Sequence, residues 1–216
     1  MAPRKKPDAG QKLLDEMLAK RGYLLSYHRL LGASDPTLLA TYDALYTRLT
    51  LDERVLTLEE REIVWIALIA ATREKLARFH LDRGVKAGMT KESIADSMAI
   101  ASACEAFDAL HFSQGAFSEW VSQKHTLARY LKMFDAARGR LPKAMAEVAA
   151  VVCHAARRNA AGMRVHLPRA FEFGARREQM AEGLSYVLLH RGGPTMVEAA
   201  DCWAQAATDL GIPGPY

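Results

Sequence analysis

Two histidines, each preceded by a glutamate at nearly the same distance, are the residues best suited to acid–base chemistry in this chain. Glu62 precedes His80 by 18 residues, and Glu147 precedes His166 by 19. A carboxylate that orients an imidazole ring allows that ring to move a proton near neutral pH. Because 18 residues of straight helix span about 27 Å, each pair can meet only if the chain folds back between its two members.

Neighbouring side chains could complete such a site. Arg78 and Arg164 each stand two residues before a histidine, and either could hold a substrate carboxylate through paired hydrogen bonds. Trp65 lies three residues after Glu62, where it could line a pocket wall. The alternative is structural, since a histidine on an amphipathic helix usually packs or is solvated, and exposed ion pairs contribute little.

The elements that must position these residues are all predicted to be helices, so the fold class is all-α. Thr57 and Glu60 form a capping box before an apolar helical segment. That helix must break near residues 71–74 if Glu62 is to meet His80. The second turn is easier to see, because Asn159 and Gly162 favour it.

Part of the sequence occurs twice. The hexapeptide from Arg78 to Arg83 reappears from Arg164 to Arg169, and the likeness continues at an offset of 86, as in Glu92 with Glu178. We therefore predict a duplicated helical unit. The predicted division is a disordered basic tail over residues 1–10, N-terminal helices plus the first repeat over 11–125, the second repeat over 126–210, and a tail over 211–216.

Composition and charge limit the classes of function. Half of the 216 residues are hydrophobic and a quarter are charged, and the net charge is +4. The charges alternate along helix faces, which does not favour nucleic-acid binding. The sequence shows no transmembrane-length apolar run and no signal peptide. We expect a cytoplasmic protein with a small-molecule substrate and with neither a nucleic-acid nor a membrane partner.

The spacing of histidine and cysteine predicts neither a metal site nor a cofactor. There is no H-E-x-x-H pattern and no Cys/His cluster. Cys104, Cys153 and Cys202 are odd in number and widely spaced, which favours reduced thiols. Each is expected to be a small buried hydrophobic side chain.

The segment from Leu58 to Ala71, followed by His80 and residues 87–96, resembles the carboxymuconolactone decarboxylase family, which includes the alkylhydroperoxidase-D-like proteins. Residues 141–203 resemble the same domain, and both copies keep a histidine-to-glycine spacing of eight. The resemblance implies a duplicated all-α domain that self-assembles. A fused duplicate suggests a homo-oligomer, either a dimer or a trimer.

The sequence departs from the peroxidase branch of that family, which has a C-x-x-C pair shortly before the histidine. Those places hold Arg73 and Leu76 in the first copy, and Asn159 and Gly162 in the second. Without a reactive thiol no sulfenate can form. We therefore expect no thiol peroxidase activity at this site.

The first copy also departs at the family's glutamate, which lies nineteen residues before the histidine. Glu147 fits that spacing, but Arg61 takes the place in the first copy. Glu62 fits only if one residue is missing from the turn, and Glu74 is a possible substitute.

The decarboxylase branch needs no cysteine, and there the resemblance implies proton transfer to a carbon acid through an enolate-like intermediate. His80 or His166 would be the acid–base group, with Glu62 or Glu147 orienting it and Arg78 or Arg164 holding a carboxylate. We favour the first copy, because Trp65 and the apolar run over 63–70 could build a dry pocket. Pro168 is expected to distort the second copy's helix.

Three functions therefore remain open. The first is a cofactor-independent lyase or decarboxylase, or an isomerase or hydrolase, acting on a small carboxylated or lactone-like molecule. The second is an alkylhydroperoxidase- or peroxiredoxin-type antioxidant that uses two of the three cysteines. The third is a binding or assembly protein without catalysis. We favour the enzyme.

Overall fold

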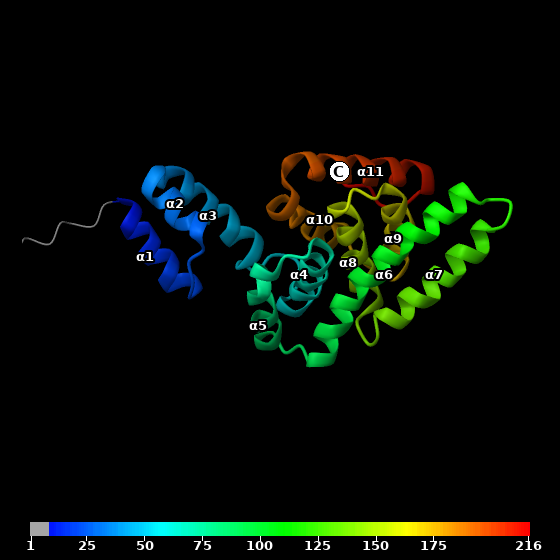
Figure 1. The fold of residues 1–216 in the computed structure, drawn as a ribbon, viewed down its shortest axis with the longest axis horizontal. Coiled ribbons are helices and arrows are strands. Elements are labelled where there is room, and N and C mark those ends of the chain that lie inside the picture. The colour runs from blue at the N-terminus through cyan, green and yellow to red at the C-terminus, as the bar shows by residue number, and fades with distance from the viewer. Residues whose placement is uncertain (1–8) are drawn as a thin grey trace, which may run out of the picture. The chain divides into compact units, whose positions relative to one another are not determined.

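The computed structural model describes residues 9–216, and within them eleven α-helices and one short 3₁₀ helix account for the regular structure, with no strand (Figure 1). The predicted all-α class is confirmed. The described residues divide into two compact units, one ending at Asp52 and one running from Glu53 to Tyr216. Residues 1–8 of the predicted basic tail lie outside the described residues, and Ala9 and Gly10 already belong to the first helix.

The first unit contains α1 (Ala9–Arg21), α2 (Ser26–Ser34) and α3 (Pro36–Thr50). Its small core is formed by Leu14, Met17 and Leu39, which are almost fully buried. Asp35 caps α3 by accepting a hydrogen bond from the backbone N–H of Leu38. This cap satisfies one of the free N–H groups at the start of the helix.

The second unit holds both glutamate–histidine pairs. Its elements are α4 (Leu58–Thr72), the 3₁₀ helix η1 (Lys75–Arg78), α5 (Phe79–Lys86), α6 (Lys91–Ala116), α7 (Gln123–Ala137), α8 (Lys143–Ala156), α9 (Ala160–Glu172), α10 (Arg177–Ser185) and α11 (Val187–Leu210). Helices α4 and α8 pack against each other, and α6 lies against both. Both central helices are apolar around nearly their whole circumference, which suits a helix buried on all sides.

Two tight turns fold the chain back after the central helices. Helix α4 ends at Thr72 and is followed by Arg73, whose φ of 55° is left-handed. Arg158, with φ 57°, follows α8 in the same way. The chain then returns as α5 and α9, which gives two helical hairpins: the first hairpin (α4–α5) and the second hairpin (α8–α9). A further kink lies inside α11 at Gly192, where φ is 75°. Each hairpin carries one glutamate on its first helix and one histidine on its second.

Candidate active site

The first hairpin brings Glu62 and His80 together. Nδ1 of His80 lies 2.7 Å from Oε2 of Glu62, and both side chains are buried. The other carboxylate oxygen of Glu62 accepts a hydrogen bond from Nε of Arg61 at 3.0 Å. The indole ring of Trp65 stacks on the imidazole of His80, with ring centroids 4.5 Å apart. The ring of His80 is therefore fixed at one nitrogen and on one face.

Burial controls the charge of the imidazoles in this region. It lowers the pKa of His80, and the charges of Arg83 and Arg61 add to that effect, while the hydrogen bond to Glu62 opposes it. Burial and the charge of His80 lower the pKa of His190 to about 4. Both rings are therefore held in their neutral forms more strongly than a solvated histidine.

The second hairpin holds a longer chain of hydrogen bonds. Nδ1 of His166 lies 2.6 Å from Oε2 of Glu147, and Nε of Arg169 donates to Oε1 of the same carboxylate at 2.8 Å. The hydroxyl of Tyr130, on α7, lies 2.6 Å from Nε2 of His166. A carboxylate accepts only, so Nδ1 carries the proton, and in the neutral form of the ring Nε2 accepts from the tyrosine.

A second buried imidazole adjoins this chain. The ring of His154 stacks on that of His166 with centroids 5.4 Å apart, and its Nε2 lies 3.4 Å from the hydroxyl of Tyr130. A Cβ atom added to Gly162 would lie 2.2 Å from Nδ1 of His154, so only glycine fits beside that ring. Burial raises the pKa of Tyr130 above its ordinary value, which keeps the hydroxyl protonated.

The two hairpins differ by one residue in the turn. Glu62 and Glu147 are 85 residues apart, as are the left-handed Arg73 and Arg158, whereas the histidines are 86 apart. The missing residue of the first hairpin falls where η1 makes a tight 3₁₀ turn, which advances further per residue than an α-helix. Glu62 is therefore the geometric counterpart of Glu147. Helix α9 runs through Pro168 without ending there.

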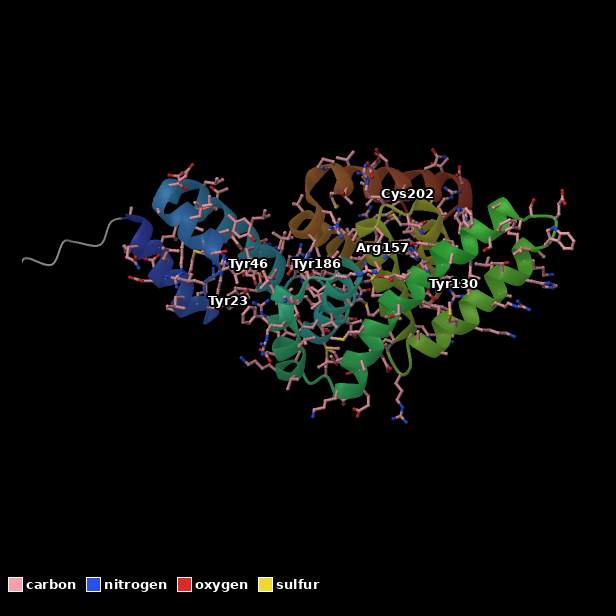
Figure 2. The ribbon with its side chains drawn as sticks, in the orientation of Figure 1. Tyr23, Tyr46, Tyr130, Arg157, Tyr186 and Cys202 are labelled. Carbon is pink, nitrogen blue, oxygen red and sulfur yellow. The ribbon has the colours of Figure 1, made fainter. Side chains whose placement is uncertain are left out.

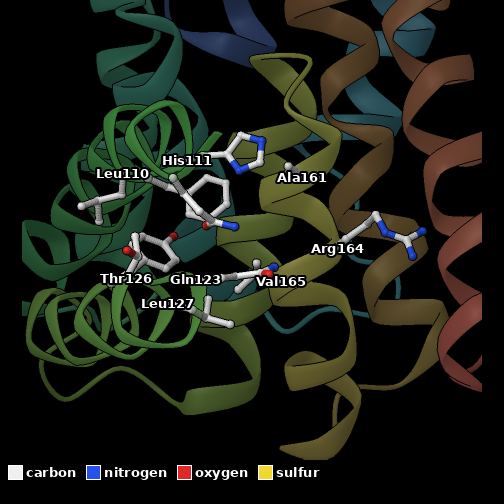
Figure 3. Close-up of a pocket in the computed structure, with 11 residues that line it drawn as sticks. Leu110, His111, Gln123, Thr126, Leu127, Ala161, Arg164 and Val165 are labelled. Atoms are coloured by element: carbon white, nitrogen blue, oxygen red, sulfur yellow. The ribbon is translucent and has the colours of Figure 1, made fainter. Parts of the chain in front are cut away.

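A pocket of about 280 Å³ lies beside the second chain of hydrogen bonds. Its walls come from α6, α7 and α9, and Tyr130, labelled in Figure 2, belongs both to the wall and to the chain. Arg164 also borders the pocket, but Figure 3 shows its guanidinium directed away from the other labelled side chains. Nη2 of Arg164 instead donates to Asp209 at 2.8 Å.

The remaining predicted site residues lie elsewhere. Arg78 and Glu74 border a separate surface hollow of about 370 Å³ together with Leu81 and Met98. Glu74 caps η1 by accepting from the N–H of Leu76. The carboxylate bonded to His80 is thus that of Glu62.

The three cysteines are at least partly buried, and none stands at the places of the family's cysteine pair. Cys104 and Cys153 are fully buried, and burial raises the pKa of Cys104 well above its ordinary value. Burial also raises the pKa of Cys202. Among the described residues, no group of three or more potential ligands could hold a metal ion. Nor is any described helix long and apolar enough to cross a membrane.

Residues 36–117 match the model of the carboxymuconolactone decarboxylase family. The match confirms the resemblance seen in the sequence over this segment, which is less than half of the chain and runs from the start of α3 to just past α6. The matched segment thus includes Glu62 and His80, whereas Glu147 and His166 lie outside it. A comparison with curated proteins gives no match. The duplication stays a prediction.

Two further residues of the site lie outside our predicted set. Arg169 is the last residue of the second hexapeptide, as Arg83 is of the first, so the repeat could have indicated it. No sequence pattern indicated Tyr130, because it lies 36 residues before His166 and outside the matched residues 36–117. Its place beside His166 arises only from the packing of α7.

Proposed function

We propose that the protein is a cofactor-independent acid–base enzyme of the carboxymuconolactone decarboxylase type that acts on a small carbonyl compound in the pocket between α6, α7 and α9. The observation that carries the proposal is the continuous hydrogen-bond chain from Glu147 through His166 to Tyr130, which ends in the pocket wall. A buried carboxylate–imidazole–hydroxyl chain can relay a proton without a metal or a cofactor.

The proton path follows from the donors and acceptors. A proton leaves the carbon next to the substrate carbonyl for the oxygen of Tyr130, while the proton of Tyr130 passes to Nε2 of His166. The C–H electron pair stays on the substrate as an enolate. The resulting imidazolium faces the carboxylate of Glu147, which Arg169 holds in place. The reverse path protonates an enolate left by decarboxylation or isomerisation.

The first pair is the second candidate for the same chemistry. In the described part of the chain, Nε2 of His80 has no side-chain hydrogen bond, although the ring itself is buried. The prediction that the first copy is the active one, which was based on Trp65, remains a competing prediction. A homo-oligomer, dimer or trimer, and a cytoplasmic location also remain predictions.

Exchange of carbon-bound protons in D₂O, followed by proton NMR, tests the proposal. The probes are uncharged ketones and lactones, with 2-tetralone as the first, and their carboxylated counterparts. We expect catalysed exchange with at least one probe, and a loss on the order of 100-fold in His166→Gln, the scale of one general acid–base group. His80→Gln serves as the matched control. Equal rates in wild type and His166→Gln would refute the assignment to the second pair.

A further inference from the structure

Most of the lining surface of the pocket between α6, α7 and α9 is apolar. Five of its eleven lining residues have apolar side chains. They come from all three helices and comprise Phe107, Leu110, Leu127, Ala161 and Val165. Its volume of about 280 Å³ is nearly twice the roughly 150 Å³ of an apolar cavity that binds benzene. The space therefore suits a molecule about as large as two fused six-membered rings.

The pocket offers little to a negative charge. Arg164 is the one lining residue that carries a permanent charge, and its guanidinium is paired with Asp209 and directed away from the lining residues labelled in Figure 3. The other polar lining residues are His111, Gln114, Gln123, Thr126 and Tyr130. The ring of His111 lies parallel to that of Phe107, with centroids 5.5 Å apart, which leaves its face covered.

We infer that this pocket takes an uncharged, largely apolar carbonyl or enol compound of bicyclic size, and that it discriminates against carboxylates. The inference rests on the proposed function for the role of the carbonyl at Tyr130, but the charge preference follows from the walls alone. Moving a carboxylate from water into an apolar site without a paired cation costs several-fold more than moving a hydroxyl. Binding a carboxylate would require Arg164 to leave Asp209.

Isothermal titration with 2-naphthol and 2-naphthoate at pH 7 tests the charge preference directly. The two probes share the same fused rings, and only the second is charged. We expect 2-naphthol to bind at least about tenfold more tightly, a difference of roughly 1.4 kcal/mol. Equal or tighter binding of 2-naphthoate would overturn the inference. If Arg164→Ala then lost 2-naphthoate binding, the arginine would be identified as the carboxylate's partner.

Two neighbouring substitutions on α9 test the place of binding. Ala161→Trp fills the pocket and should abolish 2-naphthol binding, whereas Ala160→Trp places the same side chain at an exposed position outside that pocket and should leave the affinity within about twofold. Circular dichroism of both variants confirms the fold. Unchanged binding in Ala161→Trp would place the ligand elsewhere and refute the inference.

The binding and exchange measurements separate the two proposals. If 2-naphthol binds with the expected preference while Tyr130→Phe exchanges 2-tetralone as fast as wild type, the relay fails and the charge preference stands. If exchange depends on Tyr130 but only carboxylated probes bind, the relay stands and the charge preference fails.

Discussion

The hydroxyl of Tyr130 lies 2.6 Å from Nε2 of His166. In the part of the chain that the structure describes, Nε2 of His80 has no corresponding side-chain hydrogen bond, although both histidines meet a glutamate through Nδ1. Two otherwise similar hairpins thus differ at the nitrogen that would exchange a proton. The Tyr130 phenol links the imidazole of His166 to a pocket, and the imidazole of His80 lacks such a link.

Tyr130→Phe should lower both stability and exchange activity. The substitution leaves Nε2 of His166 buried without a donor, which costs about 1–3 kcal/mol in the free energy of unfolding. We expect 2-tetralone exchange to fall by at least about tenfold, since the relay loses its outer member. Tyr186→Phe is the matched control, because the Tyr186 hydroxyl donates to buried Glu182 at 2.8 Å outside this pocket. Equal exchange in the two variants would contradict the relay.

Glu147→Gln and Glu62→Gln should be alike in stability and different in activity. Each removes the negative charge that faces a neighbouring arginine, Arg169 or Arg61, and a broken buried ion pair costs on the order of 3 kcal/mol. Only Glu147→Gln also removes the charge that stabilises the imidazolium of the proposed relay. Urea unfolding and NMR exchange measure the two effects. Loss of exchange in Glu62→Gln alone would move the active site to the first hairpin.

Gly162→Ala should destabilise the second hairpin. The new methyl group would meet the ring of His154 at 2.2 Å, and overpacking of this kind costs about 1–3 kcal/mol. Gly115→Ala, in α6, has open space around the new Cβ and should be neutral or stabilising by up to about 1 kcal/mol. Chemical denaturation of both variants provides the comparison. A Gly162→Ala protein as stable as wild type would show that His154 can move.

The stability of the second unit should fall below pH 6.5, partly because of His190. Its pKa is lowered to about 4 in the folded protein, against about 6.5 when unfolded. The unfolded chain therefore binds more protons between pH 6.5 and 4, and stability falls across that window by at most ~1.4 kcal/mol per pH unit for one group. The contribution of neutral His190 to stability is fully present above pH 6.5, and its loss levels off below pH 4. His190→Gln should flatten the slope, and an unchanged slope would assign it to other groups.

The thiols should behave as packing groups. We expect a thiol reagent such as Ellman's reagent to modify half-buried Cys202 first, and to reach Cys104 and Cys153 only when the protein unfolds. Cumene hydroperoxide should be turned over no faster by wild type than by the triple Cys→Ser variant. Rapid modification of all three thiols, with peroxide turnover that the triple variant lacks, would support the antioxidant alternative instead.

The helices and the two glutamate–histidine pairs could be predicted from the sequence, because they depend on local signals. The capping box at Thr57 and Glu60 is present as predicted, with hydrogen bonds in both directions. The separation of Glu62 from His80 required a turn, and the turn lies at Arg73. Periodicity and capping act within a few residues, so they can be read without knowledge of the packing.

The pocket and its chemistry could not be read in the same way. Tyr130 meets His166 because α7 lies beside the second hairpin, and no spacing in the sequence encodes that contact. Arg164 has the position expected of a carboxylate anchor, yet Asp209, 45 residues later, takes its guanidinium. Pairings between distant side chains are set by tertiary packing, which a single sequence does not reveal.

The one-residue difference between the two turns has a consequence for how this protein can vary. The carboxylate and the imidazole meet at 2.7 Å in one hairpin and 2.6 Å in the other, although the connecting segments differ in length. The packed helices, and not the loop, fix that distance. Insertions and deletions between Arg73 and His80, or between Arg158 and His166, should therefore be tolerated more readily than a shift of either helix, and a comparison of the halves must place its gap there.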